Sequence, residues 1–63
     1  MLFIFDKPDL YCFWNKNTLL NLKLVFMNKG KIVQESKLPA VKNGLITVCA
    51  DSPADSVVEI ADN

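Results

Sequence analysis

Short alternating runs of apolar residues, separated by turn residues, follow one another along the whole chain. No stretch keeps the 3.6-residue period of an amphipathic helix, whereas a period of two is typical of half-buried strands. The runs predict short strands at residues 1–5, 11–14, 22–27, 31–35, 45–50 and 56–61. We therefore expect an all-β fold of about six strands, either a small antiparallel sandwich or a partly open barrel.

The clearest pair of strands is the predicted hairpin of residues 22–27 and 31–35. The two runs flank Asn28-Lys29-Gly30, where Gly30 supplies the positive φ that a tight hairpin loop requires. The first strand has one apolar face, which we expect in the core, and one mixed face: Leu22, Leu24 and Phe26 against Lys23, Val25 and Met27.

Turn residues predict where the other strands end. Asp6-Lys7-Pro8-Asp9 should stop the first strand, because Pro8 has no N–H to donate. Residues 36–44 should form a loop with a helical turn at most, and residues 51–55 a second turn. The run 45–50 is apolar on both faces, so we expect a central strand there.

The composition indicates more apolar surface than the chain can bury by itself. Hydrophobic residues make up 51% of the 63 residues, and the mean hydropathy is +0.20. A chain of this length buries only about 60% of the surface that its unfolded form exposes. We expect self-association, most simply a homodimer, or flanking sequence that completes the fold.

The charges balance overall but are unevenly distributed. Seven lysines oppose seven acids, and this zero net charge does not favour nucleic acid as a partner. All seven lysines and three of the acids fall in residues 1–42, whereas the other four acids fall in residues 43–63. We expect the acidic last strand to pair with the basic hairpin within the fold; the alternative is an acidic edge that docks on a neighbour's basic face.

The cysteines and the absent histidine limit the chemistry. Cys12 and Cys49 lie far apart in sequence, and the chain contains no histidine, so no familiar zinc site is possible and no cofactor is expected. A disulfide between the two cysteines would close a long loop. Their apolar, strand-like surroundings favour buried free thiols instead.

Residues 1–5 are apolar but lack the basic segment and cleavage site of a signal peptide. No run approaches the roughly 18 apolar residues needed to cross a bilayer, so no membrane association is expected. As the chain stands, these features favour a cytoplasmic location; export stays open if an N-terminal segment is missing.

Catalysis is not expected. Without histidine, Cys–His and Ser–His–Asp constellations are excluded. An enzyme would need Lys16 or a carboxylate such as Glu59 as its general base. Asp51 and Asp55 flank a turn where they could hold a cation weakly, but solvated turn acids are the commoner case.

A candidate ligand site lies in the stretch FWNKNTLLNL, residues 13–22. Trp14, Lys16, Asn17 and Thr18 offer an aromatic ring, an amine, an amide and a hydroxyl, a set that suits a polar ligand or a protein partner. The alternative, which we favour, is architectural: Trp14 lies in the core, while Asn17 and Thr18 bond to nearby backbone groups and set a bend between strands.

The sequence resembles the uncharacterised DUF192 family over nearly its whole length. MLFIFDKP, FWNKNTL, LKLVF and GKIV occur in the order of that family's MLF-F, FWMKNTLIPLDIIF and DGxIVE elements. The tail SPADSVVEI is similar to the family's GPA-x-YVLEL strand. FW-x-KNT is the most specific match.

This resemblance implies an all-β, jelly-roll or sandwich domain that extends beyond this chain at both ends, and it implies no reaction. Bacterial members are often exported. Lys16, Asn17 and Thr18 match the motif, whereas Asn15 replaces Met and Lys23 replaces Asp. A third departure is Asn21, which stands where the family has Pro. A role of the family's aspartate therefore cannot be carried over to Lys23.

Overall fold

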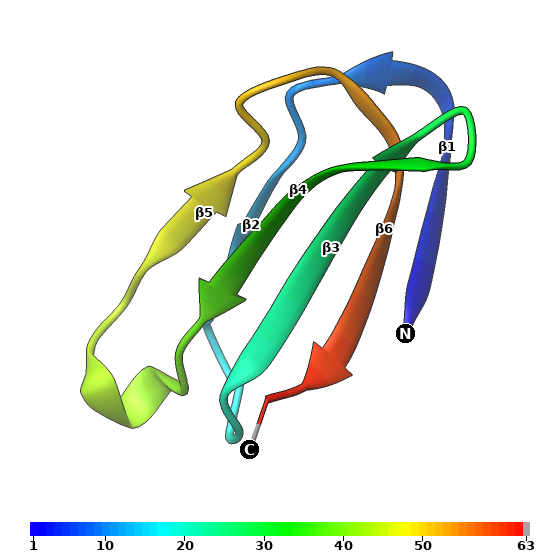
Figure 1. The fold of residues 1–63 in the computed structure, drawn as a ribbon. Coiled ribbons are helices and arrows are strands. Elements are labelled where there is room, and N and C mark those ends of the chain that lie inside the picture. Colours follow the sequence, from blue (N-terminus) through cyan, green and yellow to red (C-terminus); the bar gives the residue numbers. More distant parts are fainter. Residues whose placement is uncertain (63) are drawn as a thin grey trace.

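The computed structural model describes residues 1–62, and these form two antiparallel sheets joined by short connections (Figure 1). Strands β1, β6, β3 and β4, in this order, form a four-stranded sheet, and β2 pairs with β5 in a two-stranded ribbon. The elements in chain order are β1 (Leu2–Asp9), β2 (Cys12–Trp14), β3 (Leu22–Asn28), β4 (Lys31–Leu38), the 3-10 turn η1 (Val41–Asn43), β5 (Thr47–Cys49) and β6 (Ala54–Ala61). The predicted all-β sandwich is confirmed, and the described strands do not close into a barrel.

The core lies between the inner face of the four-stranded sheet and the β2–β5 ribbon. Leu24 and Phe26 of β3 and Val57 of β6 are completely buried, which confirms the predicted apolar face of β3. Phe13 of β2 links the two layers, since its ring centroid lies 5.2 Å from that of Phe3 and 6.1 Å from that of Phe26. Edge-to-face contacts of this kind add stability beyond the buried area.

The hairpin of β3 and β4 is confirmed. Asn28 pairs with Lys31, which leaves Lys29 and Gly30 as a two-residue turn. Both have positive φ, 52° for Lys29 and 79° for Gly30. This is the sign that a type I′ turn requires at both central positions, and its twist matches that of the flanking strands.

Two predicted strand ends are wrong. β1 does not stop at Asp6 but continues to Asp9, because β6 accommodates the turn residues as an irregularity: Ile4 pairs with Ser56, and Asp9 next pairs with Ala54. Pro8 lies inside this irregular stretch, where no ladder donor is needed. β4 likewise extends to Leu38, which pairs with Leu22, so only the later part of the predicted loop is irregular; η1 is its helical turn.

The prediction of a central strand at residues 45–50 is also wrong. β5 is shorter than that run and has one neighbour, β2. Val48 packs on the core, while Leu45 is 67% exposed. A run that is apolar on both faces therefore does not require two covered faces.

In the part of the chain that the structure describes, no helix has the length and hydrophobicity needed to cross a membrane.

The acidic strand lies where it was expected, but its ion pairs do not form. β6 pairs with β3 of the basic hairpin. Within residues 1–62, the ion pair that forms joins Lys23 to Glu35 (3.0 Å), and both residues belong to the hairpin. Asp55 instead accepts a hydrogen bond from the backbone N–H of Lys29 (3.2 Å). Among the described residues, the acids of β6 therefore lie beside the basic hairpin without forming ion pairs with it.

Candidate functional site

Asn15 lies at the predicted bend between strands and holds it through a buried side chain. It follows Phe13 by two residues, so its side chain points to the same inner face, and it is completely buried. Its Nδ2 donates to Pro39 O (2.9 Å) and Gly44 O (2.7 Å), and its Oδ1 accepts from Ile46 N (2.8 Å). Sequence reasoning missed this role, although a polar residue in phase with a buried phenylalanine was the available signal.

The chain bends after Trp14, as predicted, but the hydrogen bonds that hold the bend do not come from the side chains of Asn17 and Thr18. Asn17 has a φ of 64°, in the left-handed region that asparagine tolerates. The backbone N–H of Thr18 donates to Asn15 O (2.9 Å), and Thr18 O accepts from Val41 N (2.8 Å). Asn21 adds a side-chain bond, because its Oδ1 accepts from Ala40 N (2.9 Å). Main-chain groups and the two other asparagines therefore hold the bend in the described residues, rather than the side chains of Asn17 and Thr18.

Trp14 is not in the core, so the architectural interpretation of this residue is wrong. Its side chain is 56% exposed, because it is out of phase with the inward-facing Phe13 and Asn15. The Nζ atom of Lys16 lies 5.4 Å from the centroid of the Trp14 ring. At an exposed site such a cation–π contact contributes about 0.5–1 kcal/mol. The structure thus brings Trp14 and Lys16 together at the surface, as an aromatic face beside an ammonium group.

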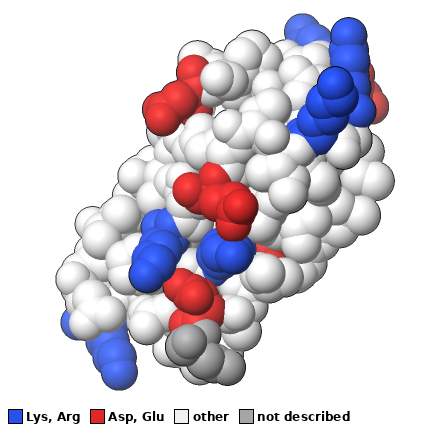
Figure 2. Space-filling view, viewed as in Figure 1, with Lys and Arg blue, Asp and Glu red and all other residues white. Residues whose placement is uncertain are grey.

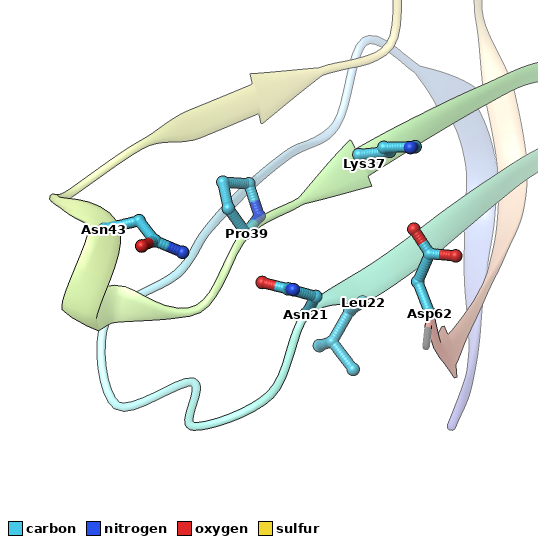
Figure 3. Close-up of a pocket in the computed structure, with 6 residues that line it drawn as sticks. All are labelled: Asn21, Leu22, Lys37, Pro39, Asn43 and Asp62. Atoms are coloured by element: carbon cyan, nitrogen blue, oxygen red, sulfur yellow. The ribbon is translucent and has the colours of Figure 1, made fainter.

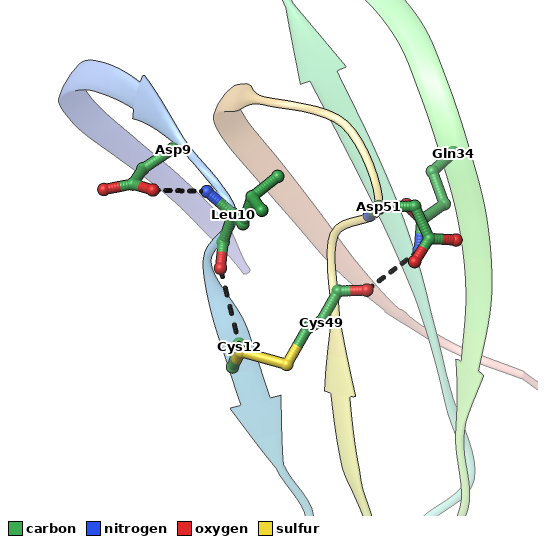
Figure 4. The surroundings of a disulfide bond; sticks show 6 residues. All are labelled: Asp9, Leu10, Cys12, Gln34, Cys49 and Asp51. Carbon is green, nitrogen blue, oxygen red and sulfur yellow. Dashed lines mark hydrogen bonds between the residues drawn. A yellow bond between two sulfur atoms is a disulfide. The ribbon is translucent and has the colours of Figure 1, made fainter.

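The expectation of buried free thiols is wrong as well. Cys12 and Cys49 are exposed, lie directly opposite each other on β2 and β5, and form a disulfide (Figure 4). The neighbouring pair carries a ladder bond, from Ala50 N to Tyr11 O (2.9 Å), so the cysteines occupy the next, non-hydrogen-bonded position. Opposite residues approach most closely there, and the two Cα atoms are 3.9 Å apart.

Gln34 connects this ribbon to the edge of the four-stranded sheet. From β4 its Nε2 donates to Cys49 O (3.1 Å), and its Oε1 accepts from Asp51 N (2.7 Å). The amide therefore replaces ladder bonds between β4 and β5, which share no strand pairing. A glutamine on the inner face of a hairpin strand was the only signal for it in the sequence.

A pocket of about 450 Å³ lies at the end of the sheet where β3 begins (Figure 3). Leu22 and Pro39 give it apolar walls, and Lys37 and Asp62 give it one charge of each sign. Asn21 and Asn43 complete the lining. Sequence reasoning missed this pocket because its lining comes from separate segments between residues 21 and 62, with no shared motif.

The outer face of the four-stranded sheet carries aliphatic side chains beside a charged group. Lys23, Glu35 and Lys37 lie on this face, and Lys23 forms an ion pair with Glu35 (3.0 Å). The strand register places seven aliphatic side chains there, in rows across neighbouring strands: Leu2, Ile4, Val25, Met27, Ile32, Val58 and Ile60. Ile4 is 76% exposed and Ile32 is 60% exposed. Figure 2 shows broad areas without charged side chains, and a group of acidic and basic side chains near the middle of the view. No element within residues 1–62 covers this outer face, because the ribbon packs on the inner one.

Tyr11 lies next to the disulfide strand and is fixed by two contacts. Its ring stacks on that of Phe5, with centroids 3.7 Å apart, and its O–H donates to Lys7 O (2.7 Å). Desolvation raises the pKa of the phenol above its usual 10.0, and the nearby carboxylates of Asp9 and Asp6 raise it further. Tyr11 is therefore a neutral hydrogen-bond donor at physiological pH.

Comparison with known protein families places the chain in a family. The model of the DUF192 family, described as an uncharacterized ACR, matches residues 1–63. The chain belongs to the DUF192 family. No curated protein and no solved structure matches it. The family assignment confirms the resemblance seen in the motifs, and because DUF192 is uncharacterised it brings no reaction with it.

The described residues of this DUF192 chain offer little for metal binding. Between residues 1 and 62, no group of three or more His, Cys, Asp or Glu side chains lies close enough to hold a metal ion. The predicted turn of residues 51–55 is shorter than expected, because β6 already begins at Ala54 and Asp55 lies in that strand. The carboxylate of Asp55 accepts hydrogen bonds from Lys29 N (3.2 Å) and from the hydroxyl of Ser56 (3.4 Å). Three surface features stand out in the described residues: the Trp14–Lys16 pair, the pocket and the outer sheet face.

Proposed function

We propose that this DUF192 chain is a non-catalytic binding module that works as a homodimer through the outer face of its four-stranded sheet. The observation that carries the proposal is the row of exposed aliphatic residues on that face, among them Ile4 and Ile32. Uncovered aliphatic side chains of this kind are typical of an interaction site. The Lys23–Glu35 ion pair, on the same face, would meet its symmetry mate or lie at the rim of the interface.

A second copy of the chain is the partner that fits best. Two such faces can pack against each other as the two layers of a sandwich do, with aliphatic side chains interdigitating about 10 Å apart. The net charge of zero leaves no overall repulsion between copies. A twofold interface also needs only one self-complementary surface.

Size-exclusion chromatography with light scattering tests the interface. The parent chain should elute with the mass of a dimer, and Ile4→Lys should elute as a monomer, because the charge would be buried without a partner. Leu19→Lys is the matched control: Leu19 is 81% exposed but lies in the connection between β2 and β3, so the dimer should persist. A folded, strictly monomeric parent chain, or dissociation by Leu19→Lys alone, would overturn the proposal.

Trp14 and Lys16, with Asn17 and Thr18 beside them in the bend, are the proposed ligand site. An exposed ring next to an ammonium group suits a flat ligand with an anionic substituent. Trp14 is the chain's single tryptophan, so indole fluorescence reports this site alone. Benzoate should quench it saturably and benzyl alcohol should not, and Lys16→Met should abolish the difference. Equal, linear quenching by both compounds would contradict the site.

The proposed module needs no cofactor, nucleic acid or membrane. The missing histidine and the balanced charge support this. For its compartment, the Cys12–Cys49 disulfide favours export over the cytoplasm, since disulfides persist in oxidising compartments.

A further inference from the structure

The Cys12–Cys49 disulfide lies on the outward face of the ribbon rather than in the core. Both cysteines are exposed, and the next pair on the same face, Trp14 and Thr47, is exposed as well. Leu10, on the other side, is 51% exposed. A disulfide is opened by a thiolate that approaches one of its sulfur atoms, so access to the sulfurs decides whether the folded protein can react.

We propose that Cys12–Cys49 is a thiol–disulfide exchange site, which a dithiol opens while the protein is folded. One thiolate of the dithiol attacks a sulfur atom and forms a mixed disulfide, and the other cysteine leaves as a thiolate and takes up a proton. The second thiol of the dithiol, after losing its proton, then displaces the first cysteine. The products are two cysteine thiols and an oxidised, cyclic dithiol, so the dithiol is oxidised by two electrons and the protein is reduced.

The contacts around the bond keep the two cysteines in place during this exchange. Cys49 is held by Gln34, whose Nε2 donates to Cys49 O (3.1 Å), independently of its sulfur. The two strands remain joined by Asn15, both through its side chain and through its backbone bond to Ile46 O (3.1 Å). Cys12 Sγ lies 3.7 Å from Leu10 O, so the thiol formed on reduction has an acceptor beside it. While the reduced protein stays folded, these contacts hold the two cysteines opposite each other, so the bond can form again.

The experiment is reduction by dithiothreitol under native conditions, followed by the release of thiols at several urea concentrations below the unfolding transition. Exchange in the folded state predicts a rate proportional to the dithiothreitol concentration, with less than a twofold change between 0 and 1 M urea. Exchange that requires global unfolding predicts a rate that rises about fivefold per molar urea, because unfolding exposes the bond in proportion to its equilibrium constant. That second result would overturn the proposal.

Circular dichroism recorded in parallel separates the two mechanisms a second time. If the folded protein reacts, thiols appear before any loss of the β-sheet signal, even if the reduced protein later loosens. Fluorescence of Trp14, two residues from Cys12 on the same face, should change with thiol release. Loss of the β-sheet signal before thiol release, or in step with it, would also overturn the proposal. The homodimer proposed above does not enter either measurement, so the two proposals fail separately.

Discussion

The four-stranded sheet and the β2–β5 ribbon are stabilised in different ways. The sheet has strands of seven or eight residues with paired backbones and a shared buried face. The ribbon has strands of three residues, and a disulfide, the buried Asn15 and Gln34 hold it in place. Isolated pairs of short strands are marginal in water. A short ribbon therefore depends on a few individual contacts, whereas a longer sheet distributes its stability over many.

Removal of the disulfide should lower the free energy of unfolding more than any other change, and it tests whether the ribbon depends on this one contact. The bond joins residues separated by 37 positions, and the chain-entropy model assigns such a loop about 4 kcal/mol. We expect Cys12→Ser/Cys49→Ser to lower the free energy of unfolding by about that amount, measured by urea denaturation. Thr47→Ser, on the same face of the ribbon, should change it by less than about 1 kcal/mol. A double variant as stable as the parent would contradict the role assigned to the bond.

Asn15→Leu should have the next largest effect. The leucine fills a similar volume but leaves Pro39 O, Gly44 O and Ile46 N without their partner, and each unpaired buried group costs about 1–3 kcal/mol. We expect a loss of about 3 kcal/mol in thermal or urea unfolding, because water can reach part of the loop. The matched control is Asn43→Leu, an exposed asparagine of η1, for which a change within about 0.5 kcal/mol is expected. Similar losses for both variants would show that burial of the Asn15 amide is not the cause.

A substitution in the turn between β3 and β4 should stabilise the protein through the four-stranded sheet, whereas the two preceding variants destabilise it through the ribbon. Lys29 has a positive φ of 52°, which asparagine adopts more readily than lysine. Lys29→Asn should therefore raise the free energy of unfolding by about 0.5 kcal/mol, and the backbone bond from residue 29 to Asp55 should persist. Lys42→Asn, which removes the same charge from η1, serves as the control and should not stabilise. A destabilised Lys29→Asn would mean that the long lysine side chain contributes more than the turn geometry.

The smallest predicted effect is the ionisation of Tyr11. Because the pKa of Tyr11 is raised, the folded state binds the phenol proton more tightly than the unfolded state does. The resulting stabilisation of the folded protein is complete below pH 10.0. It is lost as the pH rises through the pKa of Tyr11 in the folded state. Tyr11 is the single tyrosine, so a titration of tyrosinate absorbance should give a midpoint above 10.0 when folded. Asp9→Asn should move this midpoint towards 10.0 but not reach it, since desolvation is the larger cause. A folded midpoint at or below 10.0 would contradict the assigned environment.

The sequence predicted the hairpin and the buried face of the sheet, but not the ends of β1 and β4 or the orientation of the ribbon. Alternation predicted the buried face of β3, because burial of one face imposes a period of two over seven residues. In β2 the same rule needed a correct choice of phase, and Phe13 rather than Trp14 faces inward. Three residues are too few to decide that phase from pattern.

The candidate site was predicted in part. Trp14 and Lys16 do meet at the surface, whereas Asn17 and Thr18 contribute backbone conformation and main-chain bonds instead of side-chain contacts. The disulfide and Asn15 each depend on a partner more than 20 residues away. Such pairings depend on how the sheet and the ribbon pack together, and a local sequence pattern does not predict that packing.

The cross-link between Cys12 and Cys49 also encloses most of the chain, including the bend after Trp14 and the whole connection around η1. A protease that cuts the backbone once anywhere inside this ring would leave two fragments covalently tied together. Nicked and intact molecules would then co-migrate in a non-reducing gel and separate only after reduction.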